Sequence, residues 1–397
     1  MNDGRHVSAK VAAVVGLASL AAAMGIGRFA FTPIFPLMQE KLSLTLAEGA
    51  WLATANYVGY LLGACASFLL APRAGVSARG GLVAVALSTL AMAVTSSLWL
   101  WLLLRLVAGM ASAFVLIGAS AWALGHLSRH RRSDLAGWVF AGVGTGICLA
   151  GLVALALGTV RAAPAQGWAA LGVIASIVAV GTWTSLSVAT PASRAQESAA
   201  AGSLGRSAWL LVACYGAFGF GYIIPATFIP AAARILVQNP LVFGWAWPVF
   251  GLAAAISTVV VTTCFRSTAP RRTAALSLLV MAVGVAAPAV DMSLYTLAVS
   301  AVCVGGTFMV TTMAAVEEGG RISAGNPTKL IAALTAAFAL GQLAGPVVVS
   351  LSLPAGNGFT LPSAVAAALL VCSALSLLLT EGNALPAGQQ LPYERTS

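Results

Sequence analysis

The sequence predicts an all-α integral membrane protein with twelve transmembrane helices in two pseudo-symmetric six-helix halves. Hydrophobic residues make up 60% of the 397 residues and charged residues 8%, and the mean hydropathy is +0.96. Soluble domains are about 45–50% apolar and about 25% charged. The apolar residues form uniform runs of roughly 20 or more residues, the length at which a helix crosses a bilayer. They do not alternate with polar residues over about ten positions, as barrel strands do.

Twelve apolar runs follow one another along the chain. The third and fourth are separated only by the turn at Thr95–Ser97, and the stretch 190–207 between the sixth and seventh is small, polar and typical of a linker. We therefore expect an N-terminal half at 1–189, a cytoplasmic linker at 190–207, and a C-terminal half with a short cytoplasmic tail at 208–397. The runs are Val11–Met38, Ala47–Leu70, Gly80–Ser97, Leu98–Gly125, Leu135–Val160, Trp168–Ala189, Ala208–Ile235, Phe243–Phe265, Thr273–Val290, Leu294–Val316, Leu330–Leu353 and Phe359–Leu379.

A short glycine–proline pattern occurs in the first run of each half. Gly25–Gly27 is followed by Pro36 in AMGIGRFAFTPIFP, and Gly219–Gly221 is followed by Pro230 in AFGFGYIIPATFIP. The copies lie 194 residues apart (25 to 219), close to half of 397. Transporters are commonly built from such internal repeats. The pattern therefore indicates a duplicated chain.

Glycines and prolines in these runs predict close helix packing and hinges. Small residues let membrane helices approach one another, and prolines loosen the helix ends in which they lie. Gly341, Gly345 and Pro346 form a further small-residue stripe on the eleventh run, which we expect to contact the other half and to act as a hinge. No strand precedes Gly25 and Gly27, so their context excludes a dinucleotide-binding fingerprint.

The distribution of charge predicts the orientation of the chain. If both termini are cytoplasmic, fifteen of the 20 Lys and Arg residues lie in cytoplasmic segments, and only Lys41, Arg161 and Arg234 lie outside. The remaining two, Arg28 and Arg105, lie within runs. The positive-inside rule favours this orientation. The net charge of +10 then reflects topology, and we expect a lipid bilayer but no nucleic acid as a partner.

Two other features of the chain have a simple structural interpretation. Arg5 and Lys10 before an apolar run also fit a secretory signal peptide cleaved after Ala23. However, the run continues past Ala23, and cleavage would remove half of a helix whose repeat mate is intact. The six cysteines lie singly in the runs without metal or redox spacing, so we expect packing roles, no metal site and no cofactor.

Arg28 and Arg105 are the candidate site residues with the clearest chemical meaning. A charge at mid-membrane costs about 2.5–3.5 kcal/mol on insertion scales and normally faces a bundle interior or an aqueous pathway. The acidic residues fall at run ends or in loops. A cavity with two guanidiniums and no carboxylate favours an anion, and guanidinium matches carboxylate or phosphate geometry. The alternative is a structural hydrogen bond to backbone or to a neighbouring helix.

Helical spacing predicts which side chains accompany the arginines. Gly25, Arg28, Thr32 and Phe35 share a face by the i, i+3/i+4, i+7 rule. The repeat aligns Tyr222 with Arg28. Each of these polar or aromatic positions could equally serve helix packing. The substrate-binding candidates are Arg28, Thr32, Phe35, Asn56, Tyr60, Arg105, Tyr215, Tyr222, Thr307, Thr311 and Gln342.

Two local motifs resemble those of a known family. Arg105-Leu-Val-Ala-Gly109 resembles the R-x-x-x-G core of the fourth-helix motif of the major facilitator superfamily, whose arginine is linked to proton coupling. The string MGIGRFAFTPIFPLM around Arg28 resembles the YbfB/YjiJ-like bacterial branch. The resemblance implies the major facilitator fold, a bacterial inner-membrane location, and a central cavity lined by spans one, four, seven and ten. It would bring Arg28, Arg105, Tyr222 and Thr311 towards one volume.

The favoured function is secondary active transport of a small organic anion by alternating access of the two halves. No P-loop is visible, so an ion gradient is expected to drive it, with an ion such as a proton co-transported or exchanged. A monomer is expected. The alternatives are a hydrophobic-compound or drug exporter, favoured by aromatic residues, and a non-transporting sensor with the same fold. An intramembrane enzyme is disfavoured, because the three histidines lie outside the apolar centres.

Overall fold

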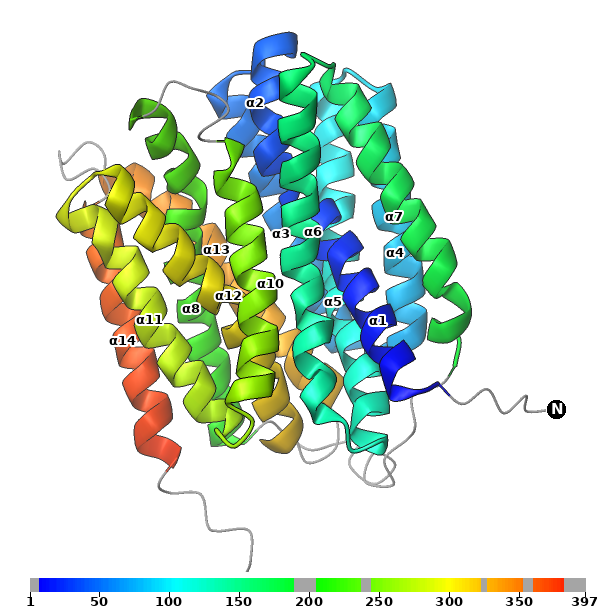
Figure 1. The fold of residues 1–397 in the computed structure, drawn as a ribbon, viewed down its shortest axis with the longest axis vertical. Helices are drawn as coiled ribbons and strands as arrows, with labels where there is room; N and C mark the ends of the chain where they lie inside the picture. Colours follow the sequence, from blue (N-terminus) through cyan, green and yellow to red (C-terminus); the bar gives the residue numbers. More distant parts are fainter. Residues whose placement is uncertain (1–6, 189–204, 237–243, 323–326, 353–359, 382–397) are drawn as a thin grey trace, which may run out of the picture.

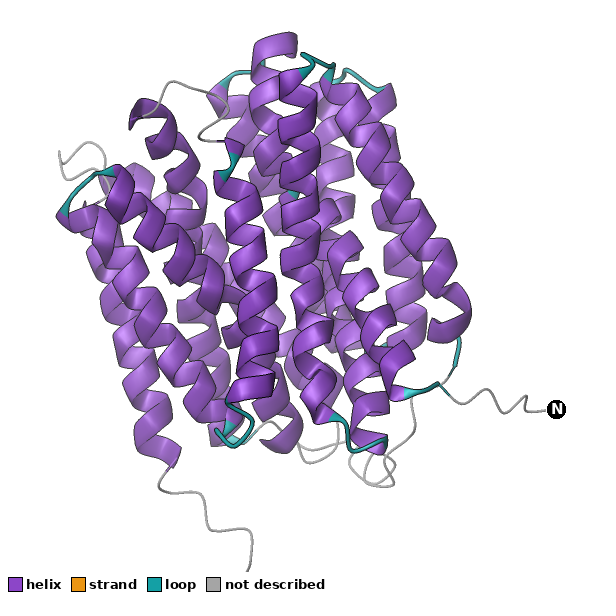
Figure 2. Ribbon diagram, viewed as in Figure 1, coloured by secondary structure: helices purple, strands orange, loops and turns teal. Residues whose placement is uncertain are grey.

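The computed structural model describes residues 7–188, 205–236, 244–322, 327–352 and 360–381, and these parts of the chain fold into helices joined by short loops (Figure 2). Within these described residues, twelve helices are long and apolar enough to cross a membrane. The prediction of twelve spanning helices is confirmed. Most of the 190–207 linker and the tail beyond residue 381 lie outside the described residues.

The first six spans form one side of the bundle in Figure 1. The first span, Ala9–Leu42, is built from three consecutive helical segments, and the fifth begins with a short 3-10 turn. The elements are α1 (Ala9–Leu20), η1 (Ala21–Phe29), α2 (Phe31–Leu42), α3 (Leu46–Leu70), α4 (Ala74–Val94), α5 (Leu98–Arg129), η2 (Ser133–Leu135), α6 (Ala136–Thr159) and α7 (Pro164–Leu186).

The last six spans form the other side of the bundle, with α8, α11 and α14 furthest from the first half (Figure 1). Prolines start α11 and α13, in the helix-initiating position where a missing N–H costs nothing. The elements are α8 (Arg206–Leu236), α10 (Ala246–Cys264), α11 (Pro270–Val290), α12 (Leu294–Ile322), α13 (Pro327–Ser352) and α14 (Thr360–Glu381).

The first span is not the single α-helix that its apolar run predicts. Residues Ala21–Phe29, which include Gly25, Gly27 and Arg28, form a π-helix. In this geometry the backbone bonds join residues five apart instead of four, so side chains shift their direction around the axis. The expected common face of Gly25 and Arg28 is therefore wrong, because that expectation used α-helical spacing.

The repeated glycines pack in equivalent places in the two halves. A Cβ on Gly25 would lie 2.3 Å from Cα of Gly146 on α6, the fifth span of its half. A Cβ on Gly219 would lie 2.3 Å from the carbonyl oxygen of Phe338 on α13, the fifth span of the other half. At both positions any side chain larger than hydrogen collides with backbone. The repeat therefore corresponds to a shared helix crossing.

The halves meet where α6 lies beside α10 and α3 beside α13 (Figure 1). Gly137, Gly144 and Gly151, seven residues apart on α6, lie so close to α10 that added Cβ atoms would come within 3 Å of it. The expected contact of Gly341 and Gly345 with the other half is wrong. Both face α8 in their own half, because α13 crosses α8 as α6 crosses η1.

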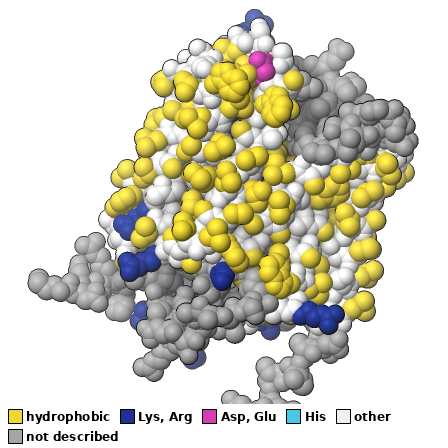
Figure 3. Space-filling model, turned by 180° about the vertical axis from the view of Figure 1, so that it is seen from behind, with side chains coloured by type: hydrophobic (Ala, Val, Ile, Leu, Met, Phe, Trp, Pro, Cys, Tyr) yellow, Lys and Arg dark blue, Asp and Glu magenta, His cyan; other side chains and the backbone are white. Residues whose placement is uncertain are grey.

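The surface is a band of hydrophobic side chains with charges at its ends. Figure 3 shows Lys and Arg side chains gathered mainly at the lower end of the bundle. Exposed large hydrophobic residues such as Leu69, Val180 and Leu379 lie on spanning helices. A surface of this kind requires lipid as its solvent.

Candidate functional site

Arg28 lies in the interior between the two halves and is 2% exposed. Its guanidinium carbon lies 3.6 Å from the centre of the Tyr60 ring on α3, a cation–π contact. The Tyr57 and Phe338 rings lie 5.6 and 5.9 Å away. Its Nη2 donates a hydrogen bond to Oε1 of Gln342 on α13. Arg28 of the first half therefore joins side chains from both halves.

Three hydrogen-bond donors at this point are buried and unpaired. Nε and Nη1 of Arg28 and Nε2 of Gln342 have no acceptor within the described part of the chain. Leaving buried donors unsatisfied costs about 1–3 kcal/mol each, and more for a charged group. A ligand that brings acceptor oxygens would satisfy all three donors, whereas a cation would satisfy none of them.

Arg105 on α5 supports the π-helical segment. It is 3% exposed, and its Nη1 and Nη2 donate hydrogen bonds to the carbonyl oxygens of Gly27 and Arg28, at 3.0 and 2.9 Å. Pro33 lies one turn further on and has no N–H to offer to the carbonyl of Arg28. Arg105 therefore uses two of its three nitrogens on backbone carbonyls.

Asn56 on α3 and Ser112 on α5 hold the same segment. Nδ2 of Asn56 donates to the carbonyl of Arg105 at 3.0 Å and to that of Gly27 at 3.4 Å. Oγ of Ser112 donates to the carbonyl of Ala23 at 2.7 Å. These bonds orient the backbone that carries Arg28.

An aromatic cluster borders Arg28 on the side of the second half. The Tyr222 and Phe308 rings stack with centroids 4.4 Å apart, and Phe338 lies 5.9 Å from Tyr222. Phe29, the neighbour of Arg28, meets the Phe308 ring edge-on at 5.8 Å across the boundary between the halves. Such arrangements are the favoured geometries of aromatic pairs.

The structure brings several predicted residues to this place and leaves others apart. Arg28, Asn56, Tyr60, Arg105 and Gln342 are joined by the contacts above. Tyr222 belongs to the aromatic cluster. Tyr215 packs against Phe218 with its ring tilted, and its hydroxyl donates to Thr312 at 3.1 Å.

The remaining predicted residues have no described contact with Arg28. Phe35 packs against Phe31 and over Gly49 at the start of α3. Thr307 donates to a carbonyl of its own helix, and Thr311 is buried with an unpaired hydroxyl. Thr32 is partly exposed on α2. These residues remain candidates for contact with a substrate that is large enough to extend beyond Arg28.

Four aromatic residues of the site were not among the predicted ones: Phe29, Tyr57, Phe308 and Phe338. Helical spacing from predicted residues would have found three of them. Tyr57 is three positions before Tyr60, Phe308 three before Thr311 and Phe338 four before Gln342. Such spacings place residues on one helix face, so each candidate indicates its aromatic neighbour.

The described carboxylates that form ion pairs lie away from Arg28, at helix ends. Glu318 is buried near the end of α12 and pairs with Arg271 and Arg321 at 3.8 and 3.6 Å. Asp134 accepts two hydrogen bonds from Arg132, each 2.8 Å long. The burial of Glu318 was not expected, because hydropathy does not show that Arg271 turns inwards to meet it.

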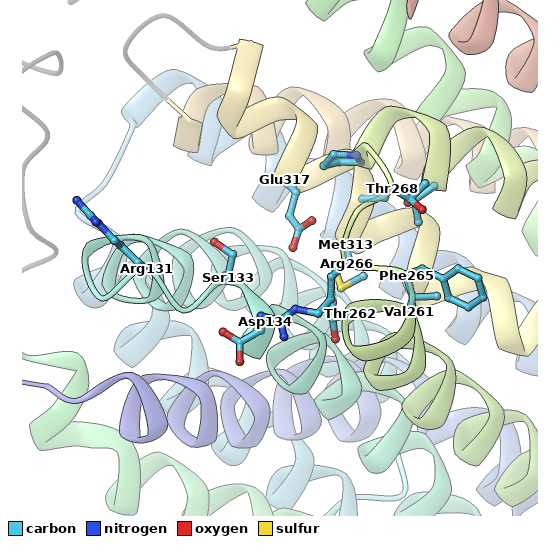
Figure 4. Close-up of a pocket in the computed structure, with 13 residues that line it drawn as sticks. Arg131, Ser133, Asp134, Val261, Thr262, Phe265, Arg266, Thr268, Met313 and Glu317 are labelled. Atoms are coloured by element: carbon cyan, nitrogen blue, oxygen red, sulfur yellow. The ribbon is translucent and has the colours of Figure 1, made fainter. Parts of the chain in front are cut away.

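A pocket of about 330 Å³ lies at the same end of the bundle, between the halves. Figure 4 shows Asp134 and Ser133 from the first half and Arg266 and Glu317 from the second half around it. Its lining carries both signs of charge. None of its lining residues is among those that contact Arg28, so it is separate from the Arg28 site.

Comparison with known proteins identifies the fold and the family. Residues 20–378 match the family described as "Uncharacterised MFS-type transporter YbfB". No curated protein matches the sequence. The structure is similar to that of FucP, a major facilitator superfamily transporter in the outward conformation, with a TM-score of 0.72, 13% identity, and coverage of 94% of this chain and 99% of that one. It is also similar to the human organic anion transporter MFSD10 (TETRAN), with a TM-score of 0.70, 16% identity, and coverage of 93% and 99%.

Proposed function

Because the chain belongs to the YbfB-type family of major facilitator transporters, we propose that it is a secondary carrier of a small organic anion, with Arg28 as the anchor for the anionic group. The proposal rests on one observation. The unpaired polar atoms of Arg28 and Gln342 are all donors, and they are buried at the boundary between the halves.

The chemistry of these donors favours an anion over the other ligand classes. The planar guanidinium of Arg28 matches a carboxylate or phosphate in bidentate fashion through Nη2 together with Nε or Nη1, so a bidentate anion would replace Gln342 at Nη2. A cationic drug would meet an uncompensated positive charge, and a neutral hydrophobic compound would leave the donors unsatisfied. MFSD10, which shares the fold, is an organic anion transporter. The substrate class of that protein agrees with the proposal.

The arrangement also provides a physical link between binding and movement. Gln342 Oε1 accepts from Arg28 across the boundary, and an incoming anion competes for the same guanidinium. Because ligands shift a conformational equilibrium only through differential affinity, replacing this bond between the halves with a ligand contact changes the relative free energy of the two access states. Transport rather than catalysis is then the role of the site. An ion gradient, such as that of protons, is the proposed energy source.

A ligand screen tests the proposed function. Purified protein is mixed with separate sets of organic anions, neutral compounds and cations, and the melting temperature is measured, because ligand binding to the folded state raises it by mass action. Anions should stabilise the wild type and leave Arg28→Gln unchanged. Arg129→Gln, at an exposed helix end, is the matched control and should respond like the wild type. Stabilisation by cations alone would overturn the proposal.

We also propose that the chain lies in the inner membrane as a monomer with both termini cytoplasmic. Single cysteines at Ser133 and Ser267 should react with an impermeant reagent only from the cytoplasmic side, and one at Ser43 only from outside. The six native cysteines are first replaced. Ser43 reacting from the cytoplasm would reverse the orientation.

A further inference from the structure

The Arg28 site has a polar part and an apolar part, which lie next to each other. At the contact between Arg28 and Gln342, the unpaired donors are Nε and Nη1 of Arg28 and Nε2 of Gln342. Beyond them, towards the second half, lie the faces and edges of Phe308, Phe338 and Tyr222. A ligand that satisfies both parts has a compact acceptor group at one end and an apolar body at the other.

The number of guanidinium groups that remain free for a ligand sets the charge of its acceptor group. Arg28 has two unpaired nitrogens, whereas Arg105 has already committed Nη1 and Nη2 to backbone carbonyls. One guanidinium therefore remains for the ligand. This guanidinium carries one positive charge, which a single carboxylate balances, and a second negative charge would find no equivalent partner among the contacts described.

The aromatic contacts indicate the shape of the apolar body. Phe29 belongs to the first half and Phe308 to the second, and their edge-to-face contact spans the boundary. Rocking of the halves must separate these rings. A flat ring placed between them would replace the lost contact, and aromatic pairs are favourable by about 0.5–1.5 kcal/mol beyond area burial. A saturated ring of the same size does not supply this term.

We propose that the substrates of this carrier are small aromatic monocarboxylates, whose carboxylate binds Arg28 and whose ring inserts between Phe29 and the Phe308–Tyr222 pair. This inference rests on the proposed function of anion transport. It adds the charge and the shape of the substrate, which the presence of Arg28 alone does not define.

A matched set of small acids tests the proposal by isothermal titration of the purified full-length protein. Benzoate is compared with cyclohexanecarboxylate, which has the same head group without aromaticity, and with phthalate, a dianion. Gluconate is a hydroxylated aliphatic acid, and benzamide and benzylamine are neutral and cationic relatives. Benzoate should bind roughly two- to tenfold more tightly than cyclohexanecarboxylate. Phthalate, gluconate, benzamide and benzylamine should bind more weakly still.

A substitution at Phe308 tests whether this ring is the cause of the preference for benzoate over cyclohexanecarboxylate. Phe308→Leu should lower the ratio of benzoate to cyclohexanecarboxylate affinity towards one, while both acids still bind through Arg28. Tyr295→Leu, at an exposed ring at the start of α12, should leave the ratio unchanged. Because the readout is a ratio within one protein, a general loss of stability does not imitate it.

The outcomes separate this inference from the function on which it rests. If gluconate or cyclohexanecarboxylate binds as tightly as benzoate, or if Phe308→Leu preserves the ratio, the aromatic assignment is wrong. If phthalate binds as tightly as benzoate, the single charge is wrong. In each of these cases anion transport stands. If no carboxylate binds and benzamide or benzylamine does, the anion carrier itself is wrong.

Discussion

The first and seventh spans carry the same glycine pattern but differ in backbone and chemistry. Gly25 and Gly219 both press against the fifth span of their own half. In the first span the pattern lies in a π-helix that bears a buried arginine, whereas α8 is helical from Arg206 to Leu236 and carries Tyr222. The two halves thus share this glycine packing, but only the first half carries the buried arginine at the repeated position.

The difference follows from what surrounds each segment. Arg105, Asn56 and Ser112 donate to carbonyls between Ala23 and Arg28. Tyr222 is instead held by stacking on Phe308 and Phe338. One half therefore presents donors and the other rings, and a ligand at the boundary meets both. Such asymmetry allows a symmetric fold to bind an asymmetric molecule.

The largest expected effect comes from removing the charge that distinguishes the first span. Arg28→Gln should weaken anion binding by about 2–5 kcal/mol, roughly 30-fold or more. Arg28→Lys should weaken it less, since charge remains without the planar fork. Titration of benzoate, with Arg129→Gln as control, measures both. Because Arg28 has unpaired donors, its replacement should leave the melting temperature unchanged or higher. A lower melting temperature with unchanged affinity per folded molecule would make Arg28 a scaffold residue.

An acceptor for the Arg28 donors that is supplied by the protein itself should also lower anion affinity. Gln342→Glu places a carboxylate beside the Arg28 guanidinium, where it would occupy the donors that we assign to the ligand. Anion affinity should fall at least about tenfold, since charge-assisted pairs are roughly twice as strong as neutral ones. Gln342→Leu is the control, because it frees Arg28 without competing for it. Unaltered binding by the glutamate variant would separate Gln342 from the site.

The hydrogen bonds from Arg105 to the π-helix should contribute to the stability of the folded protein. Arg105→Gln removes charged donors from the carbonyls of Gly27 and Arg28, and bonds to charged groups are worth about 1.5–3 kcal/mol. Its melting temperature should therefore fall, in contrast to that of Arg28→Gln, and its anion affinity should fall with it. Thermal melts of the two variants side by side make this comparison. If Arg105→Gln lost affinity and kept its full stability, Arg105 would be a ligand contact.

The shared packing of the two spans should respond equally in both halves. Gly25→Ala and Gly219→Ala each force a Cβ against backbone and should cost about 1–3 kcal/mol. Gly306→Ala, on α12 with nothing within 4 Å of the added Cβ, should be neutral or slightly stabilising. Folded yield and melting temperature report the effect. A large loss for only one of the two glycines would break the equivalence of the repeat.

The smallest expected effect on binding comes from substitutions of Tyr222, the residue of the second half that aligns with Arg28 in the repeat. Tyr222→Phe retains the ring that stacks on Phe308, so benzoate affinity should change by less than about twofold. Tyr222→Leu removes the aromatic term and should weaken binding by about two- to tenfold. A tenfold loss in the phenylalanine variant would show that the hydroxyl, and not the ring, contacts the ligand.

The sequence by itself determined the number of spans, the repeat and the two arginines that lie within spans, Arg28 and Arg105. Apolar length and composition are local properties, and lipid admits few backbone structures besides complete helices. The string around Arg28 was enough to identify the family to which the chain belongs. Its prolines indicated a loosened helix end, but the sequence did not indicate the π-helix at Ala21–Phe29.

Tertiary structure alone decided the direction of each side chain. Arg28 and Gln342 are 314 residues apart in sequence, and their meeting depends on how the two halves dock. Periodicity placed Gly25 and Arg28 on one face because it assumed an α-helix, and it assigned Gly341 to the wrong partner because a small-residue stripe fits any close crossing. Sequence pattern gives the face of a regular helix, but the partner of that face depends on the packing of the whole bundle.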